Sequence, residues 1–138
     1  MIVALAVGRL NPISFGGGKN ARFDPARAGF VGWTRHPALV ALALWAGAHL
    51  IPNGDLASAL LFGTFLAFSL SGMPFIDRRR RRQMGPRWRE LKAKTEAGPH
   101  LHAPSSCTEL GMRLAAAVAL YAGLVVMHPI LFGISPLG

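Results

Sequence analysis

The sequence predicts an all-α fold: a polytopic integral membrane helical bundle with a basic amphipathic segment on its cytoplasmic side. About half of the 138 residues are apolar (51%) and only 15% are charged. The charges gather in a few places, with nine basic residues and one acidic residue between Arg78 and Lys94. A soluble domain would interleave polar positions with its core pattern, so this distribution favours a membrane. The length allows one domain, residues 1–138.

The apolar start, Met1 to Val7, has no basic residue before it and no clear cleavage site, so it does not resemble a signal peptide. We interpret it as the end of a membrane helix whose beginning is missing, and therefore expect a shortened N-terminus. A basic loop, Phe15 to Arg35, follows. We interpret its Gly16-Gly17-Gly18 triplet as loop, because no strand precedes it and no Walker lysine-serine pair follows it. The single cysteine, Cys107, excludes an internal disulfide bond.

Residues 37–75 predict a helical hairpin. Pro37 opens the first helix, where a missing N–H costs little. The uncharged stretch from Ala38 to Ile51 is about fourteen residues, near 21 Å, and is therefore short for a full crossing. Pro52-Asn53-Gly54 predicts a turn, after which Asp55 is placed to cap a second helix. This helix, Leu56 to Phe75, has about twenty residues, enough to cross a bilayer.

The C-terminal half predicts three segments. Gln83 to Thr95 alternates apolar and basic residues, as expected of a helix lying on lipid headgroups. A linker rich in Pro, His and Ser runs from Glu96 to Glu109. The last span is expected from Leu114 to Ile134, with Arg113 at its start.

The basic residues predict one orientation. They flank the hairpin at the start of its first helix and at the end of its second. Under the positive-inside rule these ends are cytoplasmic, which places Pro52-Asn53-Gly54 and the C-terminus on the outer side. We expect the arginine run to meet anionic lipid headgroups. The run comprises Arg78, Arg79, Arg80, Arg81 and Arg82. A net charge of +9 is also compatible with nucleic acid, but basic residues that flank apolar spans do not favour that partner.

Histidines in or beside the spans are the candidate site residues, because a polar ring in a membrane is costly. His49 and His128 both fall near the outer ends of their spans and could ligate a metal or haem from opposite sides. Alternatively, His49 hydrogen-bonds a carbonyl across helices, and His128 satisfies a carbonyl that Pro129 frees. His36 lies roughly 20 Å from His49 along the helix, so the two cannot share one iron. With Arg35, it could grip an anionic group or serve as an interfacial anchor.

Four ordered motifs resemble the NnrU family, bacterial membrane proteins associated with nitrite and nitric oxide reduction. The motifs are Thr34-Arg35-His36-Pro37, Trp45-Ala46-Gly47-Ala48-His49-Leu50, Asn53-Gly54-Asp55-Leu56-Ala57 and Asp77-Arg78-Arg79-Arg80-Arg81-Arg82. The family is similar to zeta-carotene isomerase, a haem b enzyme of membranes, which shares a closing histidine-proline like His128-Pro129. The resemblance implies a bacterial inner membrane protein that binds haem b and takes part in nitrite or nitric oxide metabolism or in isomerase-like redox chemistry. It also implies that the chain lacks N-terminal helices of the family. It implies His49 as axial ligand, with His128 a possible second ligand and Arg35 and His36 at the propionates or in a structural role.

Two other functions are compatible with the sequence. The Arg35-His36-Pro37 segment and Met84-Gly85-Pro86-Arg87-Trp88 are more distantly similar to isoprenylcysteine and phospholipid methyltransferases, which implies S-adenosylmethionine binding. Leu39 and Ala41 stand where that family has tyrosine and glycine. The third possibility is a non-catalytic accessory subunit of a larger membrane complex.

Overall fold

The computed structural model describes residues 11–14, 23–28, 30–98 and 107–136, and every regular element in these ranges is helical. The all-α prediction is therefore confirmed for the described part of the chain. The elements are η1 (Pro25–Arg27), α2 (Phe30–Trp33), α3 (Pro37–Leu50), α4 (Leu56–Met84), α5 (Pro86–Ala97) and α6 (Cys107–Phe132). The expected helix end at Met1 to Val7 and the glycine triplet lie outside the described residues.

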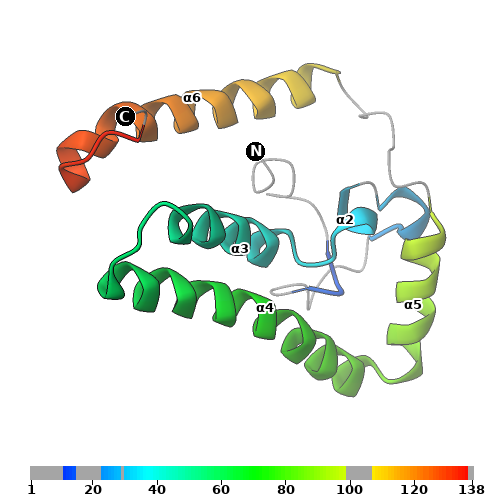
Figure 1. Cartoon of the computed structure of the whole chain (residues 1–138). Coiled ribbons are helices and arrows are strands. Elements are labelled where there is room, and N and C mark those ends of the chain that lie inside the picture. The colour runs from blue at the N-terminus through cyan, green and yellow to red at the C-terminus, as the bar shows by residue number, and fades with distance from the viewer. Residues whose placement is uncertain (1–10, 15–22, 29, 99–106, 137–138) are drawn as a thin grey trace.

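Helices α3 and α4 form the predicted hairpin, and they lie side by side and antiparallel (Figure 1). Pro37 occupies the first turn of α3, and the Asp55 carboxylate caps α4 by accepting a hydrogen bond from the Ser58 amide at 2.9 Å. The helices approach closely where Gly72 faces Leu39. A Cβ atom added to Gly72 would lie 3.2 Å from the Leu39 Cδ1 atom.

Helix α4 continues beyond the predicted end at Phe75 and includes the whole arginine run, ending at Met84. Arginine is a good helix former, and Pro74 interrupts only one backbone hydrogen bond when neighbouring turns hold the helix. The helix ends at Gly85, whose φ of 59° few other residues adopt. Pro86 then opens α5, so the predicted amphipathic helix begins three residues later than expected.

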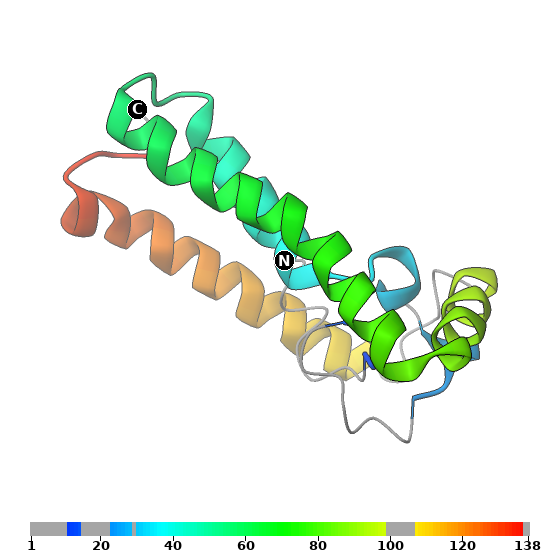
Figure 2. The same ribbon diagram turned by 90° about the horizontal axis from the view of Figure 1, so that it is seen from below.

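A small apolar core lies at the basic end of the hairpin, where α5 packs against η1, α2 and α4. Its buried side chains include Ile13, Val31 and Trp88, and Thr95 is also buried there. Gly98 lies so close to Pro25 that an added Cβ atom would come within 3.0 Å of its carbonyl oxygen. Figure 2 shows α5 turned away from the direction of the hairpin at this end.

In the described part of the chain, two helices are long and apolar enough to cross a membrane: Leu56–Met84 and, within α6, Leu110–Phe132. Very little of either candidate span is buried inside the protein. Helix α6 lies apart from the hairpin in both ribbon views, and it exposes large apolar side chains such as Leu120, Val126 and Ile130 (Figures 1 and 2). A helix that is apolar on all sides is typical of lipid surroundings or of a protein interface.

Candidate functional site

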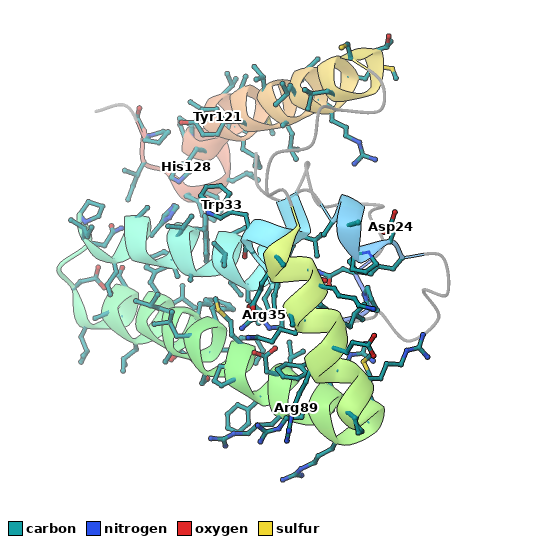
Figure 3. All side chains as sticks on the ribbon, turned by 90° about the vertical axis from the view of Figure 1, so that its right-hand side faces the viewer. Asp24, Trp33, Arg35, Arg89, Tyr121 and His128 are labelled. Carbon is teal, nitrogen blue, oxygen red and sulfur yellow. The ribbon has the colours of Figure 1, made fainter. Side chains whose placement is uncertain are left out.

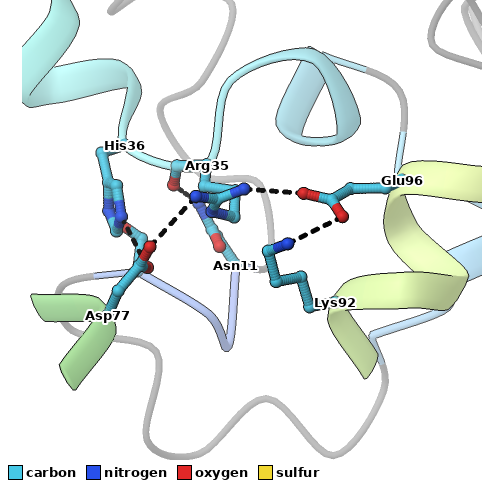
Figure 4. Close-up of polar contacts among 7 residues, drawn as sticks. Asn11, Arg35, His36, Asp77, Lys92 and Glu96 are labelled. Atoms are coloured by element: carbon cyan, nitrogen blue, oxygen red, sulfur yellow. Dashed lines mark hydrogen bonds and ion pairs between the residues drawn. The ribbon is translucent and has the colours of Figure 1, made fainter. Parts of the chain in front are cut away.

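A network of polar side chains lies at the basic end of the hairpin (Figure 4). We call it the Asp77 cluster, and it consists of Ser14, Arg35, His36, Asp77 and Glu96. Arg35 donates from its two terminal nitrogens to different acids, at 3.0 Å to Asp77 and 2.7 Å to Glu96. The second oxygen of Asp77 lies 3.0 Å from His36 Nε2. Because a carboxylate only accepts, the His36 Nε2–H is the donor.

His36 also reaches the N-terminal segment, because its Nδ1 atom lies 2.9 Å from the Ser14 hydroxyl. With Nε2 protonated, the neutral ring accepts the Ser14 proton at Nδ1. Ser14, His36 and Asp77 thus form a continuous chain of hydrogen bonds. Both Ser14 and His36 are buried, with exposed fractions of 7% and 4%. The Ser14 carbonyl accepts two further bonds from Arg80, at 3.0 and 2.8 Å, which fixes its backbone. Burial and fixed geometry fit a structural role for this serine.

The environment of His36 favours its neutral form. Burial lowers the pKa of His36, and the hydrogen bond and charge of Asp77 only partly oppose this. The ring therefore holds one tautomer, donating to Asp77 and accepting from Ser14. Arg35 and His36 both bind other side chains of the protein. This arrangement is compatible with the interfacial anchor expected from the sequence.

Peripheral contacts extend the Asp77 cluster to four parts of the chain. The Asn11 side-chain amide donates to the Arg35 carbonyl at 2.8 Å, and Lys92 pairs with Glu96 at 2.9 Å (Figure 4). The cluster therefore joins the segment 11–14, the residues before α3, the arginine-rich end of α4 and helix α5. The sequence alone indicates neither Ser14 nor Glu96 as a partner of Arg35 and His36.

His49 lies at the other end of α3, in an aromatic setting. Its ring centroid is 4.9 Å from that of Trp45 and 5.0 Å from that of Phe62. His49 Nδ1 lies 2.8 Å from the Trp45 carbonyl, within the same helix rather than across helices. A carbonyl only accepts, so Nδ1 carries the proton and the Nε2 lone pair is left available. Metal-ligating histidines use this tautomer, with the second nitrogen bonded to a carbonyl.

His128 repeats this arrangement near the end of α6. Its Nδ1 atom lies 2.7 Å from the Ile134 carbonyl, and its ring centroid is 4.8 Å from that of Phe132. The bonded carbonyl lies beyond the helix end and is not one that Pro129 frees. Again the Nε2 atom keeps its lone pair.

His49 and His128 lie toward the same end of the molecule, which is the end where the turn joins α3 to α4. Figures 1 and 2 both show the C-terminal ends of α3 and α6 at this end. Within the described residues there is no group of three or more His, Cys, Asp and Glu side chains that could hold a metal ion. A haem iron needs only one or two protein ligands. His36 lies at the opposite end of α3, in agreement with the separation predicted from the sequence.

A family model described as NnrU protein matches residues 1–136 of the chain. The chain belongs to the NnrU family. No curated protein and no solved structure matches this NnrU protein. Its motifs divide between the two ends of the hairpin: Arg35, His36 and Asp77 form the polar network, whereas His49 faces the aromatic rings beside the turn.

Proposed function

We propose that this NnrU protein is a multi-pass haem protein of the bacterial inner membrane, with His49 as an axial ligand of haem b. The observation that carries the proposal is the His49 tautomer: Nδ1–H is bonded to the Trp45 carbonyl, and Nε2 is left to ligate iron. The neighbouring rings of Trp45, Phe62 and Phe65 provide flat apolar surfaces suited to a porphyrin.

The membrane placement rests on length and charge. Helix α4 and the Leu110–Phe132 part of α6 are long enough to cross the bilayer, and their large apolar side chains are exposed. The arginine run lies at the end of the hairpin opposite the turn. Under the positive-inside rule this end is cytoplasmic, so His49 and His128 are near the outer face.

We propose His128 as the second axial ligand. Its Nδ1 atom is bonded to a backbone carbonyl as in His49, and both residues lie toward the turn end of the molecule. The proposal requires α6 to pack beside α3 so that the two rings face each other. Because α6 has an exposed apolar surface, such packing would bury surface that is now open.

A role in nitrite or nitric oxide metabolism follows from the resemblance that the NnrU motifs carry. Haem iron supplies redox chemistry and a binding position for diatomic molecules. The chain's own contribution is to orient the His49 ring, through Trp45 and Phe62, and to surround it with apolar groups.

Methyl transfer receives less support from the geometry. Both terminal nitrogens of Arg35 are bonded to carboxylates, and His36 is enclosed by Ser14 and Asp77. An S-adenosylmethionine carboxylate would have to displace Asp77 or Glu96 from Arg35.

An accessory role remains compatible with the exposed apolar surface of α6, and it predicts co-purification with a larger complex and no haem spectrum.

The test is an absorbance spectrum of the detergent-purified protein after haem addition, with and without dithionite. We expect a Soret band that His49→Ala abolishes. His128→Ala should keep a Soret band but change the spectrum from that of a two-histidine haem to that of a one-histidine haem. His102 lies in the predicted linker from Glu96 to Glu109 and is not a candidate ligand, so His102→Ala is the control and should leave the spectrum unchanged. Absence of haem uptake by the wild-type protein, or an unchanged spectrum in His49→Ala, would refute the proposal.

A further inference from the structure

The basic residues at the end of the hairpin fall into two groups. The first group is engaged inside the protein: Arg35 pairs with Asp77 and Glu96, and Arg80 binds the Ser14 carbonyl. Lys92 and Lys94 pair with Glu96 and Glu90 on their own helix. Three of the four residues therefore pair with the carboxylates of Asp77, Glu90 and Glu96, whereas Arg80 binds a backbone carbonyl.

The second group is exposed and makes no ion pair with a carboxylate in the described part of the chain. We call it the arginine face, and it consists of Arg78, Arg79, Arg81, Arg82, Arg87 and Arg89. Four of these residues lie on the last turns of α4 and two on the first turns of α5. Arg89 lies where α5 leaves the end of α4 (Figure 3). The carboxylate of Glu90 lies near Arg87 but is already paired with Lys94. The like charges of the six arginines repel one another, so an anionic partner would stabilise this surface.

The position of the arginine face in the fold indicates what the partner is. Helix α4 is continuous from the apolar span into the arginines, and Ile76 is separated from Arg78 only by Asp77. Positions 78–82 rise by roughly 6 Å along the helix. This distance is close to the thickness of one headgroup layer, about 5–8 Å on each side of the hydrocarbon core. The positions also cover more than one helical turn, so their side chains point to all sides of α4.

We infer that the arginine face binds the phosphate groups of anionic phospholipids in the cytoplasmic leaflet. The inference rests on the membrane placement of the proposed function and does not depend on haem. Guanidinium groups bind phosphate through paired N–H donors, and clusters of basic residues directly beside a span attract anionic lipids. Arg80 is excluded from this surface because its guanidinium is held by the Ser14 carbonyl.

The experiment measures lipid binding to the full-length protein in detergent by native mass spectrometry. The protein is offered equal amounts of phosphatidylglycerol and phosphatidylcholine. We expect several phosphatidylglycerol molecules to bind preferentially, and Arg79→Gln/Arg81→Gln/Arg82→Gln to reduce this preference by about tenfold or more, since each basic residue at a charged surface contributes separately. The matched variant Arg79→Lys/Arg81→Lys/Arg82→Lys keeps the charge and should retain most of the preference.

Three kinds of result would overturn the inference. The first is a wild-type protein without preference for phosphatidylglycerol, or a glutamine variant that keeps it while unfolding at the wild-type temperature. The second is displacement of the lipid by an equal concentration of inorganic phosphate, which would indicate a site for free phosphate. The third is tighter binding of single-stranded RNA than of phosphatidylglycerol at the same salt concentration. The haem spectrum of His49→Ala tests the proposed haem site and does not bear on lipid binding. Solubility of the wild-type protein without detergent would refute the membrane placement on which both proposals rest.

Discussion

The His36 Nε2 atom lies 3.0 Å from the Asp77 Oδ1 atom, although 41 positions separate the two residues. Helix α3, the turn and α4 as far as Ile76 lie between them in the chain, so this bond closes the hairpin at the end opposite its turn. The other Asp77 oxygen accepts from Arg35, which precedes His36 in the chain. One carboxylate therefore holds two neighbouring residues at the start of α3.

Replacing Asp77 tests how much this closure contributes to stability. Asp77→Asn removes the negative charge beside Arg35 and leaves a partly buried network with unmatched donors. We expect the free energy of unfolding to fall by about 1–3 kcal/mol. The measurement is thermal unfolding in detergent, followed by tryptophan fluorescence. Glu90→Gln breaks an exposed pair with Lys94 and should leave the unfolding midpoint unchanged. Equal midpoints for Asp77→Asn and the wild type would contradict this role.

The stability should depend on pH through His36. Because burial lowers the pKa of His36 in the folded state below its ordinary value of 6.5, the unfolded chain binds the proton more readily. The contribution of neutral His36 is therefore fully present above pH 6.5 and declines as the pH falls below 6.5 toward the folded-state pKa. Through His36, unfolding midpoints in the wild type should rise with pH between about pH 5 and 6.5 and level off above that range. In His36→Gln this part of the slope should disappear, and an unchanged slope would exclude His36 as its source.

Arg80 should differ from the other arginines of its run. Arg80→Lys replaces two hydrogen bonds to the Ser14 carbonyl with one at most, so the segment 11–14 should be held less firmly. We expect faster amide hydrogen exchange at Ile13 and Ser14, by about fivefold or more if roughly 1 kcal/mol of hydrogen bonding is lost. Arg79→Lys is the matched control, because Arg79 is exposed, and its exchange should equal that of the wild type. Identical exchange in both variants would count against the special role of Arg80.

Gly72 should tolerate enlargement much less than Gly63. An added Cβ atom at Gly72 already comes within 3.2 Å of Leu39, whereas one at Gly63 has no neighbour within 4 Å. We expect Gly72→Leu to separate α3 from α4 and cost about 1–3 kcal/mol of stability. Gly63→Leu should be neutral or slightly stabilising, because glycine is a poor helix former. The two variants are compared by thermal unfolding in the same detergent, and similar midpoints would refute close packing at Gly72.

The hairpin could be predicted from the sequence because its signals are local. Pro37 at the start of α3, the turn at Pro52-Asn53-Gly54 and the Asp55 cap each act on the residues beside them. The end of α4 was predicted about nine residues too early. Charge marks the end of an apolar span, but it does not end a helix. The helix ends where the backbone of Gly85 takes a positive φ, and neither hydropathy nor charge indicates that conformation.

The Asp77 cluster could be predicted only in part. Arg35, His36 and Asp77 flank the two helices of one hairpin, and antiparallel helices bring such flanking residues to the same end. Ser14 and Glu96 come from segments whose position depends on the small apolar core around Trp88 and Val31. No spacing in the sequence encodes that packing. The free Nε2 atom of His49 likewise depends on a ring rotation that only the structure gives. The ligand roles of His49 and His128 remain predictions.

The continuity of α4 has a mechanical consequence. A 29-residue helix is roughly 43 Å long, close to the full thickness of a bilayer with its headgroups, about 40–45 Å. The arginines at one end and the capped turn at the other cannot enter the hydrocarbon without a large energetic cost. If α4 crosses the membrane as proposed, a thinner bilayer would tilt the helix rather than draw its charged end into the hydrocarbon. Since Asp77 ties this helix to α3 and, through Arg35 and Glu96, to α5, a change of tilt would reorient the three helices together.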